Sequence, residues 1–202
     1  MRGVEAQRRN LRVQGYDYSQ YGPYFVTICT QKKRCLFGQV DEGKMVLNQA
    51  GQLLKSWWEK LPGKFPGIEL DQFAIMPNHF HGIIAIPGIH HVGADPCVGP
   101  DSSIQRGEPA GSPLPKIIQW FKTMTTNAYL QKVKNNGWPP FPGKLWQRNY
   151  YEHIVRTEEE LGRIREYIFY NPAKWAIDRE NPGRKKLGPA ARHLENYSEW
   201  EV

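Results

Sequence analysis

The sequence has no long hydrophobic run, few cysteines and no excess of acidic residues. No apolar stretch among the 202 residues approaches the roughly 18 residues that a membrane-spanning helix needs, and the polar opening M-R-G-V-E-A-Q-R-R-N lacks the apolar core of a signal peptide. We therefore expect a cytoplasmic protein without a membrane partner. The three cysteines, Cys29, Cys35 and Cys97, are widely spaced and show no metal-type pairing, which predicts reduced thiols.

The charge balance is basic. Lys and Arg number 27 against 20 Asp and Glu, which gives a net charge of +7 and a pI near 9.3. This balance favours a polyanionic partner, with nucleic acid as the first choice, although an anionic membrane surface would attract the same charge. A chain of this length predicts one domain with a sizeable core.

The segment A-I-M-P-N-H-F-H-G-I-I-A-I at 74–86 predicts a strand with two histidines on one face. In a strand, side chains alternate between faces, so His79 and His81 project together while Phe80 and Ile84 point to the opposite face. Their Cα atoms lie about 6.6 Å apart, which lets both rings reach one metal ion. A His-x-His pair in a strand is more often structural, so this spacing alone is a weak signal.

A second stretch, 157–175, predicts a helix that carries a tyrosine and an amide on one face. Thr157 and Glu160 have the spacing of a capping box, and the proline at 172 makes Asn171 the expected last helical residue. Tyr167 and Asn171 are four residues apart and so lie one helical turn apart. Beside a strand with two imidazoles, they would supply a nucleophile and a third ligand for one cation.

Three ordered motifs, M-P-N-H-F-H-G-I-I at 76–84, L-W-Q-R-N-Y-Y-E-H-I-V-R at 145–156 and Y-I-F-Y-N-P-A-K-W at 167–175, resemble those of a known family. The family is that of the His-hydrophobic-His single-strand nucleases, in the form of the REP-associated single-tyrosine transposases. The opening G-Y-D-Y-S-Q-Y-G-P-Y-F-V-T-I-C-T at 15–30 also fits. One departure is Tyr170, which stands where relatives often carry Asn.

The patterns of the remaining segments predict further strands and helices. Strands are expected at 24–30, 68–76 and 145–156, a hairpin at 35–48 around the turn D-E-G, and helices at 49–61 and 116–134. This order favours an α+β fold, with an antiparallel sheet and helices packed chiefly on one face. The family resemblance implies a ferredoxin-like core with the two histidines on a central strand.

Two segments of different composition flank the catalytic domain expected at 15–176, and a third is inserted into it. Residues 1–14 form a basic arm, residues 87–115 a loop rich in Gly, Pro and Ser, and residues 177–202 a basic tail. Neither a regular element nor nearby ligands support a second metal site at the histidine pair 90–91. Candidate DNA contacts come from the arm, the long helix and the last predicted strand: Arg8, Arg9, Arg12, Lys122, Arg148 and His153. A solvated surface explains the lysines equally well, and a structural role explains His153 equally well.

The chemistry expected of this residue set is the cleavage and rejoining of single-stranded DNA. His79, His81 and Asn171 offer nitrogen and oxygen ligands that suit Mg²⁺ or Mn²⁺, although Zn²⁺ also fits the ligand types. Tyr167 would attack the phosphorus and form a 5′-phosphotyrosine. No general base is evident. The resemblance implies a substrate folded as an imperfect palindromic hairpin with a short single-stranded flank.

Other functions fit parts of the same sequence. A domesticated protein that binds DNA hairpins without cutting them would share the fold, but an intact set of His79, His81, Tyr167 and Asn171 argues against lost activity. A small metallohydrolase explains neither the basic charge nor the position of Tyr167. Relaxase-type plasmid enzymes share the chemistry, but they are usually longer and typically place the tyrosine before the histidines. The sequence leaves open whether the protein is a monomer or a homodimer.

Overall fold

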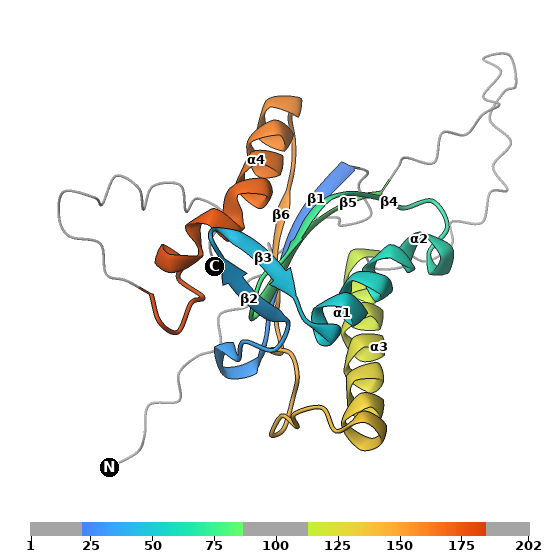
Figure 1. The fold of residues 1–202 in the computed structure, drawn as a ribbon. Helices are drawn as coiled ribbons and strands as arrows, with labels where there is room; N and C mark the ends of the chain where they lie inside the picture. Colours follow the sequence, from blue (N-terminus) through green and yellow to red (C-terminus); the bar gives the residue numbers. More distant parts are fainter. Residues whose placement is uncertain (1–21, 87–112, 185–202) are drawn as a thin grey trace, which may run out of the picture.

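The structure is a computed structural model that describes residues 22–86 and 113–184 (Figure 1). Its strands are β1 (Gly22–Cys29), β2 (Gly38–Asp41), β3 (Lys44–Leu47), β4 (Glu69–Ile75), β5 (His79–Ile86) and β6 (Tyr151–Ile154). Its helices are α1 (Gln49–Glu59), α2 (Leu61–Lys64), α3 (Pro113–Asn136) and α4 (Glu158–Lys174), with short 3-10 turns η1 (Gln31–Lys33) and η2 (Trp175–Ile177). The predicted arm at 1–14, residues 87–112 of the predicted loop and the tail beyond 184 lie outside the described residues.

The main sheet is antiparallel, with strand order β4-β5-β1-β6. When the separate β2–β3 hairpin is set aside, the chain runs β1-α1-β4-β5-α3-β6. This strand order and connectivity are those of a ferredoxin-like core, which confirms the predicted α+β fold. The two central strands are β1 and β5. Both are buried along nearly their whole length, because each has a neighbouring strand on both sides and helices cover both faces of the sheet.

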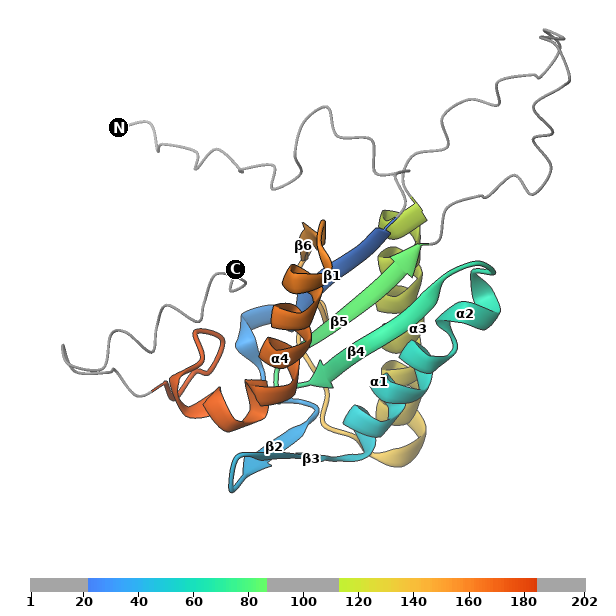
Figure 2. The same ribbon diagram turned by 90° about the horizontal axis from the view of Figure 1, so that it is seen from above.

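Helices cover both faces of this sheet (Figure 2). On one face, α1 and α3 enclose the larger core, which includes Trp58, Phe80 and Phe121. On the other face, α4 packs Ile164 and Ile168 against residues of β1 and β5. The prediction of helices chiefly on one face therefore holds for α1 and α3, while α4 forms its own layer on the histidine face.

Gly82 in β5 packs directly beneath Trp58. A Cβ atom at this position would lie 2.5 Å from Cζ2 of Trp58 and 2.8 Å from Cε1 of Phe80. Both rings are fully buried, so neither can move aside. We expect Gly82→Ala to lower the free energy of unfolding by about 1–3 kcal/mol, measured by urea denaturation. Gly63→Ala is the matched control, because no atom lies within 4 Å of its added Cβ. Equal midpoints for the two variants would contradict this packing.

The predicted elements differ from the observed ones mainly at their ends. The strand expected at 145–156 is shortened to β6, because the carbonyls of Gln147 and Arg148 accept hydrogen bonds from the Lys122 ammonium rather than from a neighbouring strand. The long helix α3 begins at residue 113, inside the predicted loop, since Leu114 is fully buried against the core. The helix expected at 49–61 is shorter in the structure: α1 ends at Glu59, and α2 follows it as a separate turn.

The expected end of α4 at Asn171 is wrong, because the helix continues through Pro172 to Lys174. A proline this close to the end of a helix costs only one backbone hydrogen bond, and Trp175 N–H donates to the carbonyl of Pro172 to close the last turn. Within residues 22–86 and 113–184, no helix combines the length and the apolar character needed to cross a membrane.

Candidate active site

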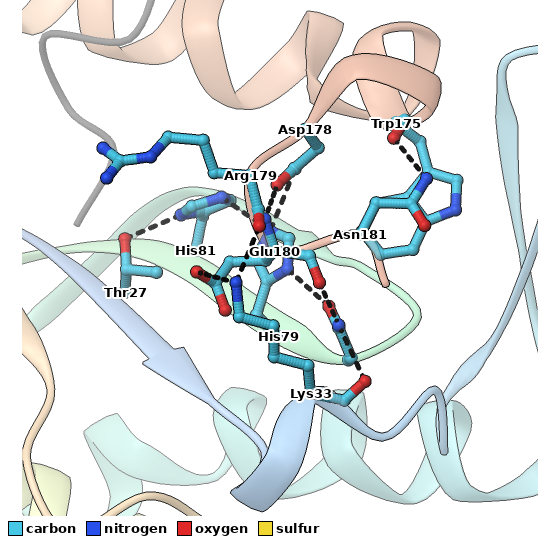
Figure 3. A network of polar contacts seen from close by, with 10 residues as sticks. Thr27, Lys33, His79, His81, Trp175, Asp178, Arg179, Glu180 and Asn181 are labelled. Carbon is cyan, nitrogen blue, oxygen red and sulfur yellow. Dashed lines mark hydrogen bonds and ion pairs between the residues drawn. The ribbon is translucent and has the colours of Figure 1, made fainter. Parts of the chain in front are cut away.

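The two histidines of β5 face α4, and their imidazoles meet (Figure 3). His79 Nε2 lies 3.0 Å from His81 Nε2, with the ring planes inclined at 75°. The rings project to the same side because the residues alternate along β5, opposite Cys29 and Thr27 of β1. Both side chains are almost completely buried, with 1% and 2% exposure.

The outward ring nitrogens are held by polar partners. His79 Nδ1 lies 2.9 Å from Asn78 Oδ1, and Asn78 uses its amide N–H groups on the carbonyls of Lys33 and Glu180. Asn78 therefore presents its oxygen to His79, and His79 Nδ1 donates the hydrogen bond. In a neutral ring, His79 Nε2 then carries a lone pair. His81 Nδ1 lies 2.8 Å from the hydroxyl of Thr27.

Both imidazoles are neutral at pH 7. Burial lowers the pKa of His79 to about 3, although a contact with Asn171 opposes this shift. Burial also holds the pKa of His81 well below its usual value, and the neighbouring His79 adds to the effect. Neutral imidazole is the form that binds metal ions.

The two Nε2 atoms are so close that a proton or a cation must lie between them. In the free protein, a proton on His81 Nε2 satisfies this need if the Thr27 hydroxyl donates to His81 Nδ1. A cation satisfies it equally well. His79 Nε2 and His81 Nε2, 3.0 Å apart, are close enough that both would hold the same ion.

Tyr167 and Asn171 project from α4 toward these rings. The Tyr167 ring meets the edge of His81 at a centroid distance of 5.3 Å, and the side chain is 6% exposed. Asn171 is also buried, and its Oδ1 has no hydrogen-bond partner of good geometry. An amide oxygen without a partner, beside two imidazole nitrogens, is a donor set that fits a divalent cation. The structure brings together all four side chains that the sequence singled out.

An additional carboxylate, which the sequence reading missed, lies close to the histidines. Asp178 Oδ2 is 3.7 Å from His79 Nε2, and Asp178 is 5% exposed. Within the described part of the chain, no three side chains of His, Cys, Asp or Glu are arranged to hold a metal ion. The candidate ligand set therefore depends on the amide oxygen of Asn171.

Asp178 belongs to residues 175–184, which fold over the histidines and which we call the cover (Figure 3). Lys33 anchors it, because its ammonium donates to the Arg179 carbonyl at 2.7 Å and pairs with Glu180 Oε1 at 3.3 Å. Asn78 donates to the Glu180 carbonyl at 2.6 Å, and the Trp175 ring lies 6.0 Å from that of His79. No periodicity in the sequence indicates this segment, most of which falls in the predicted basic tail at 177–202.

The predicted DNA contacts fall in different places. Lys122 is half-buried, and its ammonium donates to the carbonyls of Gln147 and Arg148 at 2.6 and 3.1 Å. His153 has a structural partner, because its Nε2 lies 2.8 Å from Glu160 Oε1 near the start of α4. Arg8, Arg9 and Arg12 lie outside the described residues, and the structure does not test their predicted role.

Comparisons with known proteins place this chain among relatives. No protein-family model matches the sequence. An uncharacterised protein of Haemophilus influenzae is 38% identical over 179 residues, covering 85% of this chain and 91% of that protein. A second H. influenzae protein, provisionally named a REP-associated tyrosine transposase, is 26% identical over 158 residues, covering 78% of this chain and 74% of its own length.

Two solved structures are also similar. One is a REP-associated tyrosine transposase bound to a REP hairpin, at a TM-score of 0.49 and 18% identity, covering 85% of this chain and 74% of that one. The other is a provisionally assigned transposase from Deinococcus radiodurans, at a TM-score of 0.42 and 17% identity, covering 78% and 95%. The sequence similarity to the named relative spans most of this chain. Over most of its length, this chain is thus similar in sequence to a protein named as a REP-associated tyrosine transposase.

Proposed function

We propose that this protein nicks and rejoins single-stranded DNA at hairpin-forming repeats, with Tyr167 as the nucleophile and a divalent metal as cofactor. The observation that carries the proposal is the meeting of four side chains between β5 and α4. Two facing imidazole nitrogens, an amide oxygen without a partner and a tyrosine ring lie in one buried site. No other part of the described chain brings these groups together.

Each residue would have a defined task. The Tyr167 oxygen attacks the phosphorus, the bond from phosphorus to the 3′ oxygen breaks, and the products are a 5′-phosphotyrosine and a free 3′-hydroxyl. Because the phosphotyrosine is itself an ester, a 3′-hydroxyl can attack it and restore a DNA strand without ATP. Asn78 and Thr27 hold the two imidazoles in the orientation that directs both Nε2 atoms into the site.

A divalent cation held by His79, His81 and Asn171 would supply positive charge beside a phosphate oxygen and the phenol, whose ordinary pKa is about 10. Nitrogen and oxygen donors without a thiolate favour Mg²⁺ or Mn²⁺. The name of the H. influenzae relative suggests REP elements as the substrate, and the net charge of +7 fits a polyanion.

The direct test uses the full-length protein and a labelled DNA hairpin with a single-stranded flank. In the presence of Mn²⁺, we expect a nicked product and a protein–DNA adduct that survives denaturing electrophoresis. Hairpin binding without a nick or an adduct would instead support a protein of the same fold that binds DNA but does not cleave it.

Cleavage further requires that the cover move, because side chains with 1–2% exposure cannot touch a phosphate. The Lys33–Glu180 ion pair helps to hold the cover in place, and it is partly exposed. Such pairs contribute about 0.5–1 kcal/mol, so Glu180→Gln should raise the nicking rate about two- to fivefold. The measurement is single-turnover nicking of the labelled hairpin.

Glu59→Gln is the control for this substitution. It makes the same chemical change and removes an exposed ion pair with Lys55 on α1. Nicking by Glu180→Gln at or below the rate of this control would contradict the requirement for opening.

A further inference from the structure

A second candidate site lies between α3 and the segment 143–150, which we call the α3 groove. It is a surface hollow of about 560 Å³, within the size range of small-ligand sites. The segment that forms its outer wall connects α3 to β6 (Figure 1). The groove is separate from the histidines, because α3 covers the opposite face of the sheet.

The lining of the α3 groove has charge of one sign. Lys122, Lys144 and Arg148 line it, and no Asp or Glu is among its lining residues in the described chain. Gln119 and Gln147 add amide groups, and Tyr150 adds an aromatic ring. Cations without a neighbouring carboxylate select an anionic ligand, while amides and an aromatic ring can bond to and stack on a base.

Lys122 is held in the groove rather than extended into solvent. Its ammonium donates to the carbonyls of Gln147 and Arg148, which fix its position but leave its positive charge unpaired by a carboxylate. Burial lowers the pKa of Lys122 to about 8. An anion bound in the groove would therefore stabilise the charged form.

One wall of the α3 groove is attached to the end of the sheet that carries the histidines. Gln147 N–H donates to the carbonyl of Cys29 at 2.9 Å, and Cys29 pairs with His79 across the two central strands. One wall of the groove is thus attached one strand away from the histidines. A flexible DNA strand that passed around this end of β1 from the active site would reach the groove.

We propose that the α3 groove binds one or two unpaired nucleotides of the same DNA substrate, with its cations on phosphates and its amides and Tyr150 on the base. This inference rests on the proposed function and adds to it the part of the substrate that lies outside the hairpin. A DNA duplex is too wide to enter a hollow of this volume. A single strand, in contrast, exposes the base edges and faces that such side chains recognise.

The test is a double substitution, Lys144→Ala with Arg148→Ala, in the full-length protein. Both side chains are exposed, so the fold should persist, whereas a Lys122 substitution would strip two carbonyls of their donor. Binding is measured by fluorescence anisotropy to a hairpin with a single-stranded flank and to the same hairpin without it. We expect about tenfold weaker binding to the flanked hairpin and less than about twofold change for the blunt one.

A matched control removes the same charge from the helix that forms the other wall of the groove. Lys132→Ala with Lys134→Ala also deletes two exposed cations, which lie on α3, and neither lines the groove. The slope of log affinity against log salt concentration should become shallower by about 1.4 in the groove variant and stay unchanged in the control. This result would support two phosphate contacts. The proposal is overturned if the groove variant loses equal affinity for both hairpins. It is also overturned if both double variants lose equal affinity, or if the affinity of the groove variant is unchanged.

Nicking of the flanked hairpin by the wild-type protein is measured in parallel with Mn²⁺. If the flanked hairpin is bound in a flank-dependent way but is not nicked, the proposed function is contradicted and the groove stays supported. Normal nicking with binding that does not depend on Lys144 and Arg148 contradicts the groove alone.

Discussion

Replacing Tyr167 by Phe will abolish the covalent protein–DNA adduct and reduce nicking by at least about a thousandfold, because the substitution removes the attacking oxygen. Hairpin binding should stay within about twofold of the wild type. The ring itself is retained, together with its edge contacts to Phe25 and His81. We therefore expect a change in the free energy of unfolding of no more than about 1.5 kcal/mol. Denaturing gels with labelled DNA report the adduct, and urea denaturation reports the stability.

Tyr170→Phe provides the matched control for this prediction. Tyr170 lies on the same helix but is 47% exposed, and its ring contacts that of Phe169. The same hydroxyl deletion there should leave adduct formation unchanged. An adduct formed by Tyr167→Phe would exclude Tyr167 as the nucleophile, and loss of the adduct in both variants would point to a change in α4 instead.

Replacing His81 by Ala will weaken Mn²⁺ binding and nicking more than about a hundredfold, since it removes one of two neutral imidazoles whose Nε2 atoms face the site. Metal binding has a readout independent of activity. A ligand that binds only the folded protein stabilises it by about 2.7 kcal/mol at a concentration of 100 times its Kd. Mn²⁺ should therefore raise the Tm of the wild-type protein and of Tyr167→Phe, but not that of His81→Ala.

His153→Ala is the control for the His81 substitution. His153 also lies on a strand, but its ring pairs with Glu160 and not with another imidazole. This variant should keep the Mn²⁺-dependent rise in Tm, with only a modest loss of stability from the lost hydrogen bond to Glu160. A full Mn²⁺ response in His81→Ala would show that the histidine pair is a structural hydrogen bond and not a metal site.

The sequence predicted the parts of the site that depend on local geometry. Strand alternation placed His79 and His81 on one face, opposite Phe80, and the structure confirms this placement. The capping box was also correct, since the Thr157 hydroxyl accepts a hydrogen bond from Glu160 N–H at the start of α4. Helical spacing then set Tyr167 and Asn171 on the same buried side. Each of these features follows from neighbours within a few residues.

The features that the sequence did not reveal depend on contacts between distant residues. The cover rests on Lys33 and Asn78, which are 146 and 102 residues away from their partners in it. The same is true of the shortened last strand, whose carbonyls are taken by Lys122 on α3. Lys122 and Arg148 were both named as candidate DNA contacts, but nothing in their spacing indicated that they would line one groove with Lys144.

By itself, the sequence determined the two elements that carry the chemistry, because backbone periodicity fixes which side chains on one strand or one helix share a face. The tertiary structure alone decided that these two elements pack together with the imidazoles, the amide and the phenol in contact. It also decided that residues 175–184 lie over the histidines and that a wall of the basic groove is attached at the same end of the sheet. Such arrangements arise from the packing of whole layers, which sums many weak long-range contacts that no local pattern encodes.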